Sequence, residues 1–448
     1  MDASNSTTPK LKVAICGGGV SGLFLAVALS RCAGIQVDVY EAADQFKEIG
    51  AGIMIWARTW WILESLGLGP AFSKIAHAPP DGSIETGFNF RRSDQAQEGF
   101  CFQMVRMPYG CVRFYRVSFL DVFIDALPEN VAHFGTRLVS YSQEIGRGVN
   151  LSFADGSTAT CDIFVGCDGI KSCIRGQLFR EVSERSGNSD LLKFVDPVWT
   201  GTIAYRGLIP VERLPPHHRS IVEPMMYCGK SKSLLQHVVS YSISAGSVVN
   251  VVTFASEPQN EGKPYKEDTW VSHCPQQELL DCYAHWEPEV EQLLSQIENP
   301  TKWFIHHLRP LPFYVDGNVA LLGDACHGMA PHEGIYAEYC TGAGAGQAIE
   351  DAYILASLLE QVSKETLPIQ STLPCALKAY EVIRLPFANH VLQGSYDSGL
   401  MYEFDNAEYG DNYEVLGPAI EKQWHWVEDP SPQVERLRAL ECFKDLIS

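Results

Sequence analysis

The sequence predicts an α/β protein in which a parallel-sheet domain is interrupted by a second, antiparallel β-sheet domain and followed by a helical C-terminal segment. Residues 11–41 run through strand, glycine-rich turn, helix and strand. Residues 195–305 contain several segments of alternating apolar and polar residues. The chain beyond residue 371 has the periodicity of helices. The expected boundaries are 11–80, 105–180 and 306–370 for the first domain, 190–305 for the second and 371–448 for the C-terminal segment.

The composition is that of a globular protein with an acidic surface. The chain has 448 residues, of which 46% are hydrophobic and 20% charged, enough for two or three domains. The net charge of −20 argues against a nucleic-acid partner, and an anionic substrate would need a local cation. No apolar run is long enough for a membrane span, and the start, MDASNSTTPKLK, lacks the apolar part of a signal peptide. The fourteen cysteines are scattered, without metal-ligand spacing. We therefore expect a cytoplasmic protein with reduced thiols, no membrane partner and no metal.

Residues 11–41, LKVAICGGGVSGLFLAVALSRCAGIQVDVYE, carry the first chemical motif, a Rossmann-like Gly-x-Gly-x-x-Gly turn between strand and helix. The first glycine allows the tight turn, the second lets the backbone approach a pyrophosphate, and the third lets the helix pack on the strand. The helix start offers unpaired N–H groups to the phosphates. The acid that ends the second strand is placed to accept hydrogen bonds from ribose hydroxyls. The predicted dinucleotide-binding residues here are Gly17, Gly19, Val20, Ser21, Gly22 and Glu41.

Two later stretches indicate that the dinucleotide is FAD rather than NAD. The apolar strand in IFVGCDGIKSCIR, residues 163–175, ends at Asp168, and the strand VALL ends at Gly323-Asp324. Asp324 is placed to bind ribityl hydroxyls. A second glycine-rich helix start follows, whose amides can face the pyrophosphate and the flavin ring edge. Its predicted contacts are Gly342, Ala343 and Gly344. These motifs disfavour an NAD-dependent dehydrogenase.

With GxGxxG near the start, DG in the middle and GD late, the chain resembles the single-component FAD-dependent aromatic hydroxylases, which share the fold of para-hydroxybenzoate hydroxylase. Within this family it most resembles the salicylate hydroxylases. The resemblance runs over nearly the whole chain and implies a Rossmann-like FAD-binding domain with an inserted β-sheet substrate domain. By position, Gly52 and Arg116 would contact FAD, and Pro331 would lie near the isoalloxazine. Ala57-Arg58 stands where the family usually has Pro-Asn, which leaves the flavin contacts of that segment open.

The resemblance also implies a reaction. NADH or NADPH would dock transiently and reduce FAD, and O2 would then give a C4a-hydroperoxyflavin that hydroxylates an electron-rich phenol. For salicylate, attack at the carboxyl-bearing carbon would release CO2 and give catechol. The alternatives are hydroxylation of another phenolic acid, dearomatisation of a phenol, and a non-catalytic flavin-binding isoform. The sequence is compatible with a monomer or a homodimer.

Three residues of the predicted substrate sheet are candidates for substrate contact, and alternate residues on such strands face one side. Arg206 could pair with a carboxylate or phenolate, or form a surface salt bridge. His237 could orient or deprotonate a phenol, or be a core histidine. Tyr241 lies four residues after His237 and so shares its face, and its alternative role is packing. The two strands LLQHVVSYSIS and GSVVNVVTF are expected to form a hairpin through SAGS.

Residues 334–341, GIYAEYCT, interrupt the third motif. In the family the proline is followed after two residues by the glycine run, so these eight residues form a clean insertion. We expect the insert either to loop outward at modest entropic cost or to weaken FAD retention.

Overall fold

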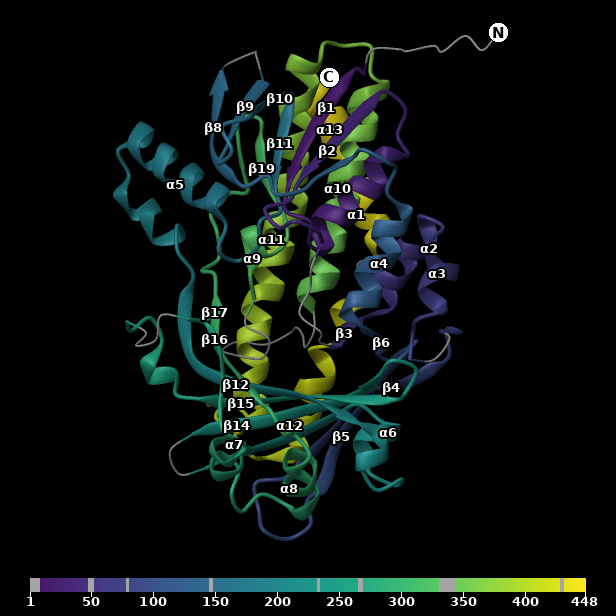
Figure 1. Ribbon diagram of the computed structural model, residues 1–448, viewed down its shortest axis with the longest axis vertical. Helices are drawn as coiled ribbons and strands as arrows, with labels where there is room; N and C mark the ends of the chain where they lie inside the picture. The colour runs from purple at the N-terminus through teal and green to yellow at the C-terminus, as the bar shows by residue number, and fades with distance from the viewer. Residues whose placement is uncertain are drawn as a thin grey trace.

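The fold is described by a computed structural model in which two large sheets lie at opposite ends and the long helix α11 (Ile369–Tyr402) runs between them (Figure 1). This confirms the predicted α/β organisation. Within the described ranges, no helix combines the length and apolarity needed to cross a bilayer. The structure describes residues 9–46, 52–77, 80–144, 148–231, 234–264, 269–329, 343–427 and 431–448.

The six-stranded sheet carries the predicted nucleotide motifs. Its strand order is β18-β19-β11-β1-β2-β7, and β19, β11, β1, β2 and β7 run parallel. Parallel strands present their carboxyl ends at one edge, so the residues after β1, β2, β11 and β19 meet there. The strands are β1 (Leu11–Cys16), β2 (Ile35–Tyr40), β7 (Ala132–His133), β11 (Ile163–Gly166), β18 (Val315–Asp316) and β19 (Val319–Leu321).

Helices and smaller sheets cover this domain. Helix α1 packs against α10, and α10 against α13, while the three-stranded sheet of β8, β9 and β10 lies beside β11 and α5 contacts β8 (Figure 1). The helices are α1 (Val20–Ser30), α2 (Ala57–Ser65), α3 (Gly69–Ser73), α4 (Arg116–Ala126), α5 (Cys173–Ser186), α9 (Asp324–His327), α10 (Ala343–Lys364) and α13 (Pro432–Ile447). The smaller sheets are β3 (Gly52–Ile55) with β6 (Val112–Tyr115), and β8 (Leu138–Glu144), β9 (Gly148–Phe153) and β10 (Thr158–Cys161).

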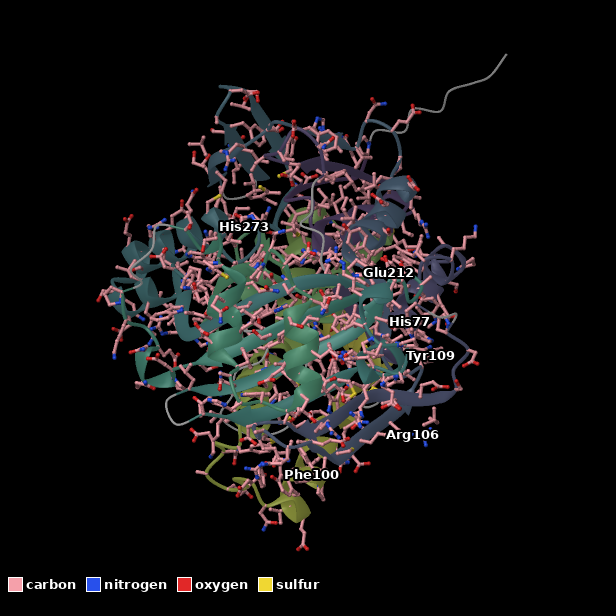
Figure 2. All side chains as sticks on the ribbon, turned by 60° about the horizontal axis from the view of Figure 1, so that its bottom comes forward. His77, Phe100, Arg106, Tyr109, Glu212 and His273 are labelled. Atoms are coloured by element: carbon pink, nitrogen blue, oxygen red, sulfur yellow. The ribbon has the colours of Figure 1, made fainter. Side chains whose placement is uncertain are left out.

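The eight-stranded sheet forms the other end, in the order β16-β17-β12-β15-β14-β13-β4-β5. In Figure 2, His273 of β16 and Arg106 of β5 mark opposite margins of this sheet. The predicted hairpin is confirmed, since β14 and β15 pair antiparallel across residues 244–247. Strands β4 and β5 come from residues outside the expected 190–305 range. The elements are β4 (Ile84–Arg92), β5 (Phe100–Pro108), β12 (Val198–Pro210), β13 (Met225–Lys230), β14 (Leu235–Ile243), β15 (Val248–Ser256), β16 (Val271–His273) and β17 (Thr301–His307), with helices α6 (Arg219–Val222), α7 (Gln276–Cys282) and α8 (Pro288–Ser295).

Helix α11 continues through Pro374 and Pro386, so neither proline ends it. Its second half, with α12 (Tyr413–Lys422), packs on the eight-stranded sheet in an aromatic core that contains Trp424 and Trp426. Both tryptophans are buried there and contribute apolar packing.

Candidate active site

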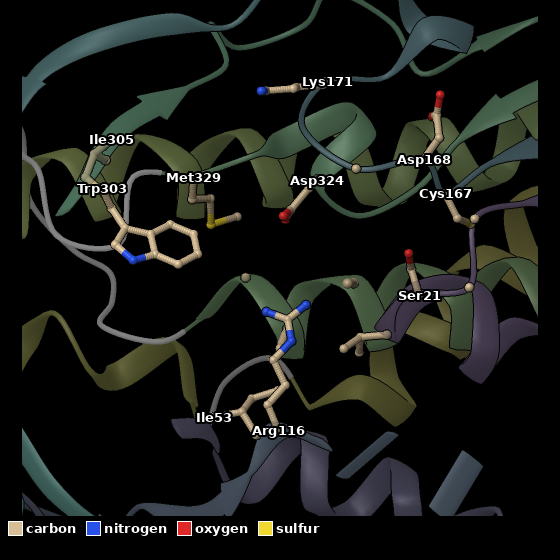
Figure 3. A pocket seen from close by; sticks show the side chains of 18 of the residues that line it. Ser21, Ile53, Arg116, Cys167, Asp168, Lys171, Trp303, Ile305, Asp324 and Met329 are labelled. Atoms are coloured by element: carbon tan, nitrogen blue, oxygen red, sulfur yellow. The ribbon is translucent and has the colours of Figure 1, made fainter. Parts of the chain in front are cut away.

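A cavity of about 790 Å³ lies where the carboxyl edge of the six-stranded sheet meets the eight-stranded sheet (Figure 3). The sequence-predicted residues that line it are Gly17, Gly19, Val20, Ser21, Glu41, Gly52, Arg116, Asp168, Arg206, Tyr241, Asp324 and Gly344. Gly22 and His237 are not among the lining residues, and the side chain of Ala343 lies outside the described part of the structure. Pro331, Gly342 and the insert 334–341 lie outside the described residues.

The first glycine turn has the geometry that its spacing predicts. Gly17 has φ 107°, and a Cβ there would lie 2.3 Å from the Cys167 carbonyl oxygen. A Cβ at Gly22 would lie 2.0 Å from the carbonyl oxygen of Gly17, so this glycine is required for helix α1 to pack close to the turn. At Gly19 a Cβ would meet no atom within 4 Å. That position opens into the cavity, where a ligand would come close to the backbone.

This contrast predicts different outcomes for two alanine substitutions. Gly17→Ala should destabilise the protein and abolish FAD retention, because the left-handed backbone and the Cys167 carbonyl both exclude a side chain. Gly19→Ala should fold normally but bind FAD at least tenfold more weakly, because its methyl group occupies cavity space. Thermal unfolding of the FAD-free proteins and fluorescence titration with FAD separate the two effects. Equal FAD affinity of Gly19→Ala and wild type would contradict the proposed approach of the pyrophosphate.

Three carboxylates reach the cavity from the ends of three parallel strands. Glu41 accepts hydrogen bonds of 2.8 Å from the backbone N–H groups of Gly18 and Ala43, which fix its position after β2. Asp168 accepts one of 2.8 Å from the N–H of Cys173 through Oδ2, whereas its Oδ1 is buried and has no partner among the described residues. Asp324 projects into the cavity opposite Arg116 (Figure 3). The unpaired Oδ1 and the open space at Gly19 fit a bound polyhydroxylated dinucleotide such as FAD.

Asp351, a residue absent from the sequence-based site, anchors the short helix that presents Asp324. Its Oδ2 accepts a hydrogen bond of 3.1 Å from the N–H of Gly323 and lies 2.5 Å from Nε2 of His327. Its Oδ1 lies 2.8 Å from Nε of Arg384 on α11. Burial opposes ionisation of Asp351, but the adjacent His327 and Arg384 outweigh burial and hold its pKa below the ordinary value. Only its position seven residues after Gly344, on the inward face of the predicted helix, could have indicated this role.

Arg58 has a structural role at the position where the family usually has the Asn of a Pro-Asn pair. Its guanidinium is buried and pairs bidentately with Glu350 of α10, at 2.7 and 2.9 Å, and with Glu435 of α13, at 2.9 Å. Helix α2 also approaches the first turn of α10, where a Cβ at Gly346 would lie 2.8 Å from Oγ1 of Thr59. Arg58 is not among the lining residues of the cavity. The Ala57-Arg58 pair therefore ties the C-terminal helix to the helix that begins at the cavity.

The other end of the cavity is formed by alternate residues of four strands. Arg206 from β12, Tyr241 from β14 and Trp303 from β17 all line it, and the Arg206 guanidinium lies 5.0 Å from the centre of the Trp303 ring. Among the described residues, no carboxylate lies within 4.0 Å of Arg206. Burial lowers its pKa, but a guanidinium remains charged under all ordinary conditions. A partly buried cation that lines the cavity without a carboxylate partner indicates a binding position for an anionic ligand group.

Tyr241 is placed between this cation and the backbone of Gly52. A Cβ at Gly52 would lie 2.5 Å from the Tyr241 hydroxyl oxygen, so glycine is needed for the ring to occupy its position. Burial raises the pKa of the Tyr241 phenol, which the nearby Arg206 lowers only in part. The phenol thus stays protonated and can donate a hydrogen bond to a ligand in the cavity.

His237 lies behind the wall of the cavity. Its ring stacks on Phe254, with ring centres 4.5 Å apart, and its Nδ1 lies 2.8 Å from Oε1 of Glu403. Burial lowers the pKa of His237 to about 3 and raises that of Glu403 well above its ordinary value, so both groups favour the neutral state. Phe254 itself lines the cavity. The geometry supports a role in holding Phe254, and direct contact between His237 and a substrate stays a prediction without a geometric counterpart.

Comparison with known proteins connects this geometry with an enzyme family. The "FAD binding domain" family profile matches residues 10–395. A salicylate hydroxylase from Pseudomonas putida is 35% identical over 436 residues, covering 95% of this chain and 93% of the relative. A 6-methylsalicylate 1-monooxygenase from Aspergillus terreus is 29% identical and covers 98% of this chain and 93% of the relative. Among solved structures, a salicylate hydroxylase substrate complex matches with a TM-score of 0.81 at 30% identity, over 96% of this chain and 98% of that one.

Proposed function

The chain belongs to the family of FAD-dependent monooxygenases that includes salicylate hydroxylase, and from this premise we propose that it converts salicylate to catechol. In the balanced reaction, salicylate, O2, NAD(P)H and two protons give catechol, CO2, water and NAD(P)+. The observation that carries the substrate assignment is the Arg206 guanidinium, which lines the cavity beside Tyr241 and has no carboxylate partner among the described residues. A phenolic acid offers the anionic group that this end of the cavity lacks.

The first end of the cavity would hold FAD through the backbone of the glycine turn and the carboxylates after three strands. Glu41 would bind the adenosine ribose and Asp324 the ribityl chain, with Arg116 facing Asp324 across the cavity (Figure 3). When bound, FAD supplies the redox chemistry, accepting electrons from NAD(P)H and using O2 for hydroxylation. The protein contributes position and the exclusion of water.

The second end would orient the substrate ring. Arg206 would pair with the substrate carboxylate, which fixes the carboxyl-bearing carbon relative to the flavin. The protonated Tyr241 would donate a hydrogen bond to an oxygen of the substrate and favour its anionic form. Trp303, Phe254 and Val239 supply apolar walls that keep water from the reacting carbon.

The deciding experiment combines a spectrum with an assay. We expect purified protein to show a bound-flavin absorption spectrum after FAD addition. Salicylate should then stimulate NADH oxidation and yield catechol in proportion to the NADH consumed. The 6-methyl and 4-hydroxy analogues of salicylate, together with benzoate itself, test the substrate class. All of them carry the carboxylate that Arg206 requires, and they differ in the ring substituents, which Arg206 does not select.

Each failure has a distinct meaning. Bound flavin without any response to salicylate would overturn the substrate assignment and favour another phenolic acid or a phenol that is dearomatised. Bound flavin without NADH oxidation for any phenol would favour a non-catalytic flavin-binding protein. Absence of bound flavin would implicate the insert, and the assay would be repeated with residues 334–341 deleted.

A further inference from the structure

Arg113 of β6 lies behind the substrate end of the cavity and does not line it. The residue is only 5% exposed, and its Nη1 donates a hydrogen bond of 3.2 Å to Oγ of Ser242, a neutral acceptor on β14. Its Nε is buried without a partner among the described residues, and no carboxylate in the same part of the chain lies within 4.0 Å of its guanidinium. Arg113 is therefore a buried cation without a counterion.

Such a charge is costly to bury, because only a counterion or several hydrogen bonds can replace the lost hydration of a cation. Arg58 and Arg384 are similarly buried, but each of them faces the carboxylates of Glu350 and Glu435. Arg113 has a serine hydroxyl instead. This contrast favours a role for the Arg113 charge in the neighbouring site over a role in stability.

The Tyr241 phenol is the cavity group next to this charge. Ser242 directly follows Tyr241 on β14, so the hydrogen bond from Arg113 holds the guanidinium beside that residue. Burial raises the pKa of Tyr241, and Arg206 and Arg113 both act against burial. Burial also lowers the pKa of Arg113, an effect that Cys111 and Tyr241 oppose. Tyr241 is therefore flanked by two guanidinium groups, one that lines the cavity and one that lies behind it.

We propose that Arg113 is a positioning residue that acts through Tyr241: it polarises the Tyr241 O–H bond and strengthens the hydrogen bond donated to the phenolic oxygen of the substrate. This inference rests on the proposed function and adds how the site favours the ionised phenol. A bound phenolic acid carries one negative charge on its carboxylate and gains a second when the phenol loses its proton to solvent. Arg206 faces the first charge directly, and Arg113 offsets the second through Tyr241.

The test follows ionisation of the bound phenol in the oxidised, FAD-loaded protein, where no turnover occurs. The probe is 5-fluorosalicylate, whose fluorine lies para to the phenolic oxygen, so its 19F resonance shifts when the phenol loses its proton. We expect the phenol to be more acidic when bound to wild type than in free solution. Arg113→Met should raise the apparent pKa of the bound phenol by about one unit or more, because a nearby cation stabilises the anion. Arg113→Lys should restore part of this shift, because it keeps the charge.

The titratable groups around Tyr241 and Arg113 keep their charge state between pH 5 and pH 10. Burial lowers the pKa of each of the two histidines to about 3 and raises that of the thiol to about 12, while the guanidinium groups remain charged. These groups are His77, His237, Cys111, Arg113 and Arg206. A change of the 19F resonance in this range therefore reports the ionisation of the probe.

Two controls separate this role from a structural one. Arg106→Met removes the same charge at an exposed position of β5 and should leave the apparent pKa of the probe unchanged (Figure 2). Arg113→Met should unfold at the same temperature as wild type or higher, because an apolar side chain replaces a cation without a counterion. Benzoate, which has the carboxylate but no phenol, should bind about equally to both proteins. A loss of both stability and benzoate affinity in Arg113→Met would identify a structural arginine and overturn the proposal.

Tyr241→Phe tests whether Arg113 acts through the hydroxyl. In that background Arg113→Met should have little further effect on the apparent pKa of the probe, whereas an undiminished effect would overturn the transmission through Tyr241. A bound phenol that is no more acidic than in solution, or that does not respond to Arg113→Met, would overturn the proposal. Catechol formation from salicylate by the same protein would then leave the proposed function intact. Failure of wild type to bind 5-fluorosalicylate would overturn both the proposal and the substrate assignment.

Discussion

Arg206→Met should lower kcat/KM for salicylate by roughly 100-fold or more, through KM and kcat together. Loss of one partner from a buried, hydrogen-bonded charge pair costs about 2–5 kcal/mol, and each 1.4 kcal/mol is about a factor of ten. Methionine keeps much of the volume beside Trp303 but removes the positive charge. The substrate carboxylate would then be buried without a partner, and the ring would lose the contact that fixes its orientation. Steady-state NADH oxidation with catechol quantified gives the loss in coupled turnover.

The control is a substrate without the carboxylate. Phenol should be a poor substrate of the wild-type protein, and Arg206→Met should leave its kcat/KM within about threefold, because no charge pair is lost. Arg206→Lys should retain more salicylate activity than Arg206→Met, since an ammonium keeps the charge but cannot form the bidentate hydrogen bonds of a guanidinium with a carboxylate. An equal loss for salicylate and phenol would indicate a general packing defect and would remove the support for a carboxylate site at Arg206.

Much of the Rossmann-like domain could be predicted from the sequence because its constraints are local. A tight turn, a backbone approaching a phosphate and a helix packed on a strand each require glycine at a fixed spacing, and the structure places Gly17, Gly19 and Gly22 accordingly. The acids at Glu41, Asp168 and Asp324 follow from the rule that parallel strands present their carboxyl ends at one edge. The hairpin of β14 and β15 likewise needed only alternation and the turn residues.

The contacts between distant segments could not be predicted in this way. Strands β4 and β5 join the larger sheet by pairing β4 with β13, more than a hundred residues later, and no local pattern encodes that partner. His237 shares the strand face of Tyr241, but its position behind the cavity wall depends on Glu403, which directly follows α11. The role of Arg58 could not be predicted either, because its ion-pair partners Glu350 and Glu435 lie 292 and 377 residues later in the chain and meet it only in the folded protein.

Arg58→Met should lower the free energy of unfolding by about 3–5 kcal/mol at pH 8, because it leaves Glu350 and Glu435 buried with only Arg384 beside them, at 3.4 and 3.5 Å. Burial already raises the pKa of Glu435, an effect that Arg384 and Arg58 partly offset. Without Arg58 that pKa should rise further. A carboxyl whose pKa is raised by folding loses stability as the pH rises through the folded pKa. The deficit should therefore be larger at pH 8 than at pH 5, measured by urea denaturation with FAD in excess.

A double variant tests whether the buried charge is the cause. Glu435→Gln in the Arg58→Met background removes one unpaired carboxylate, so the double variant should be more stable at pH 8 than Arg58→Met alone. Arg438→Met, on the exposed side of α13, should unfold like wild type. Because α2 approaches α10 at Gly346, Arg58→Met should also weaken FAD binding, and Glu435→Gln should restore part of that affinity. A deficit that is equal at pH 5 and pH 8, or that Glu435→Gln deepens, would mean that Arg58 acts through its packing on Phe387 and Trp426 rather than through its charge.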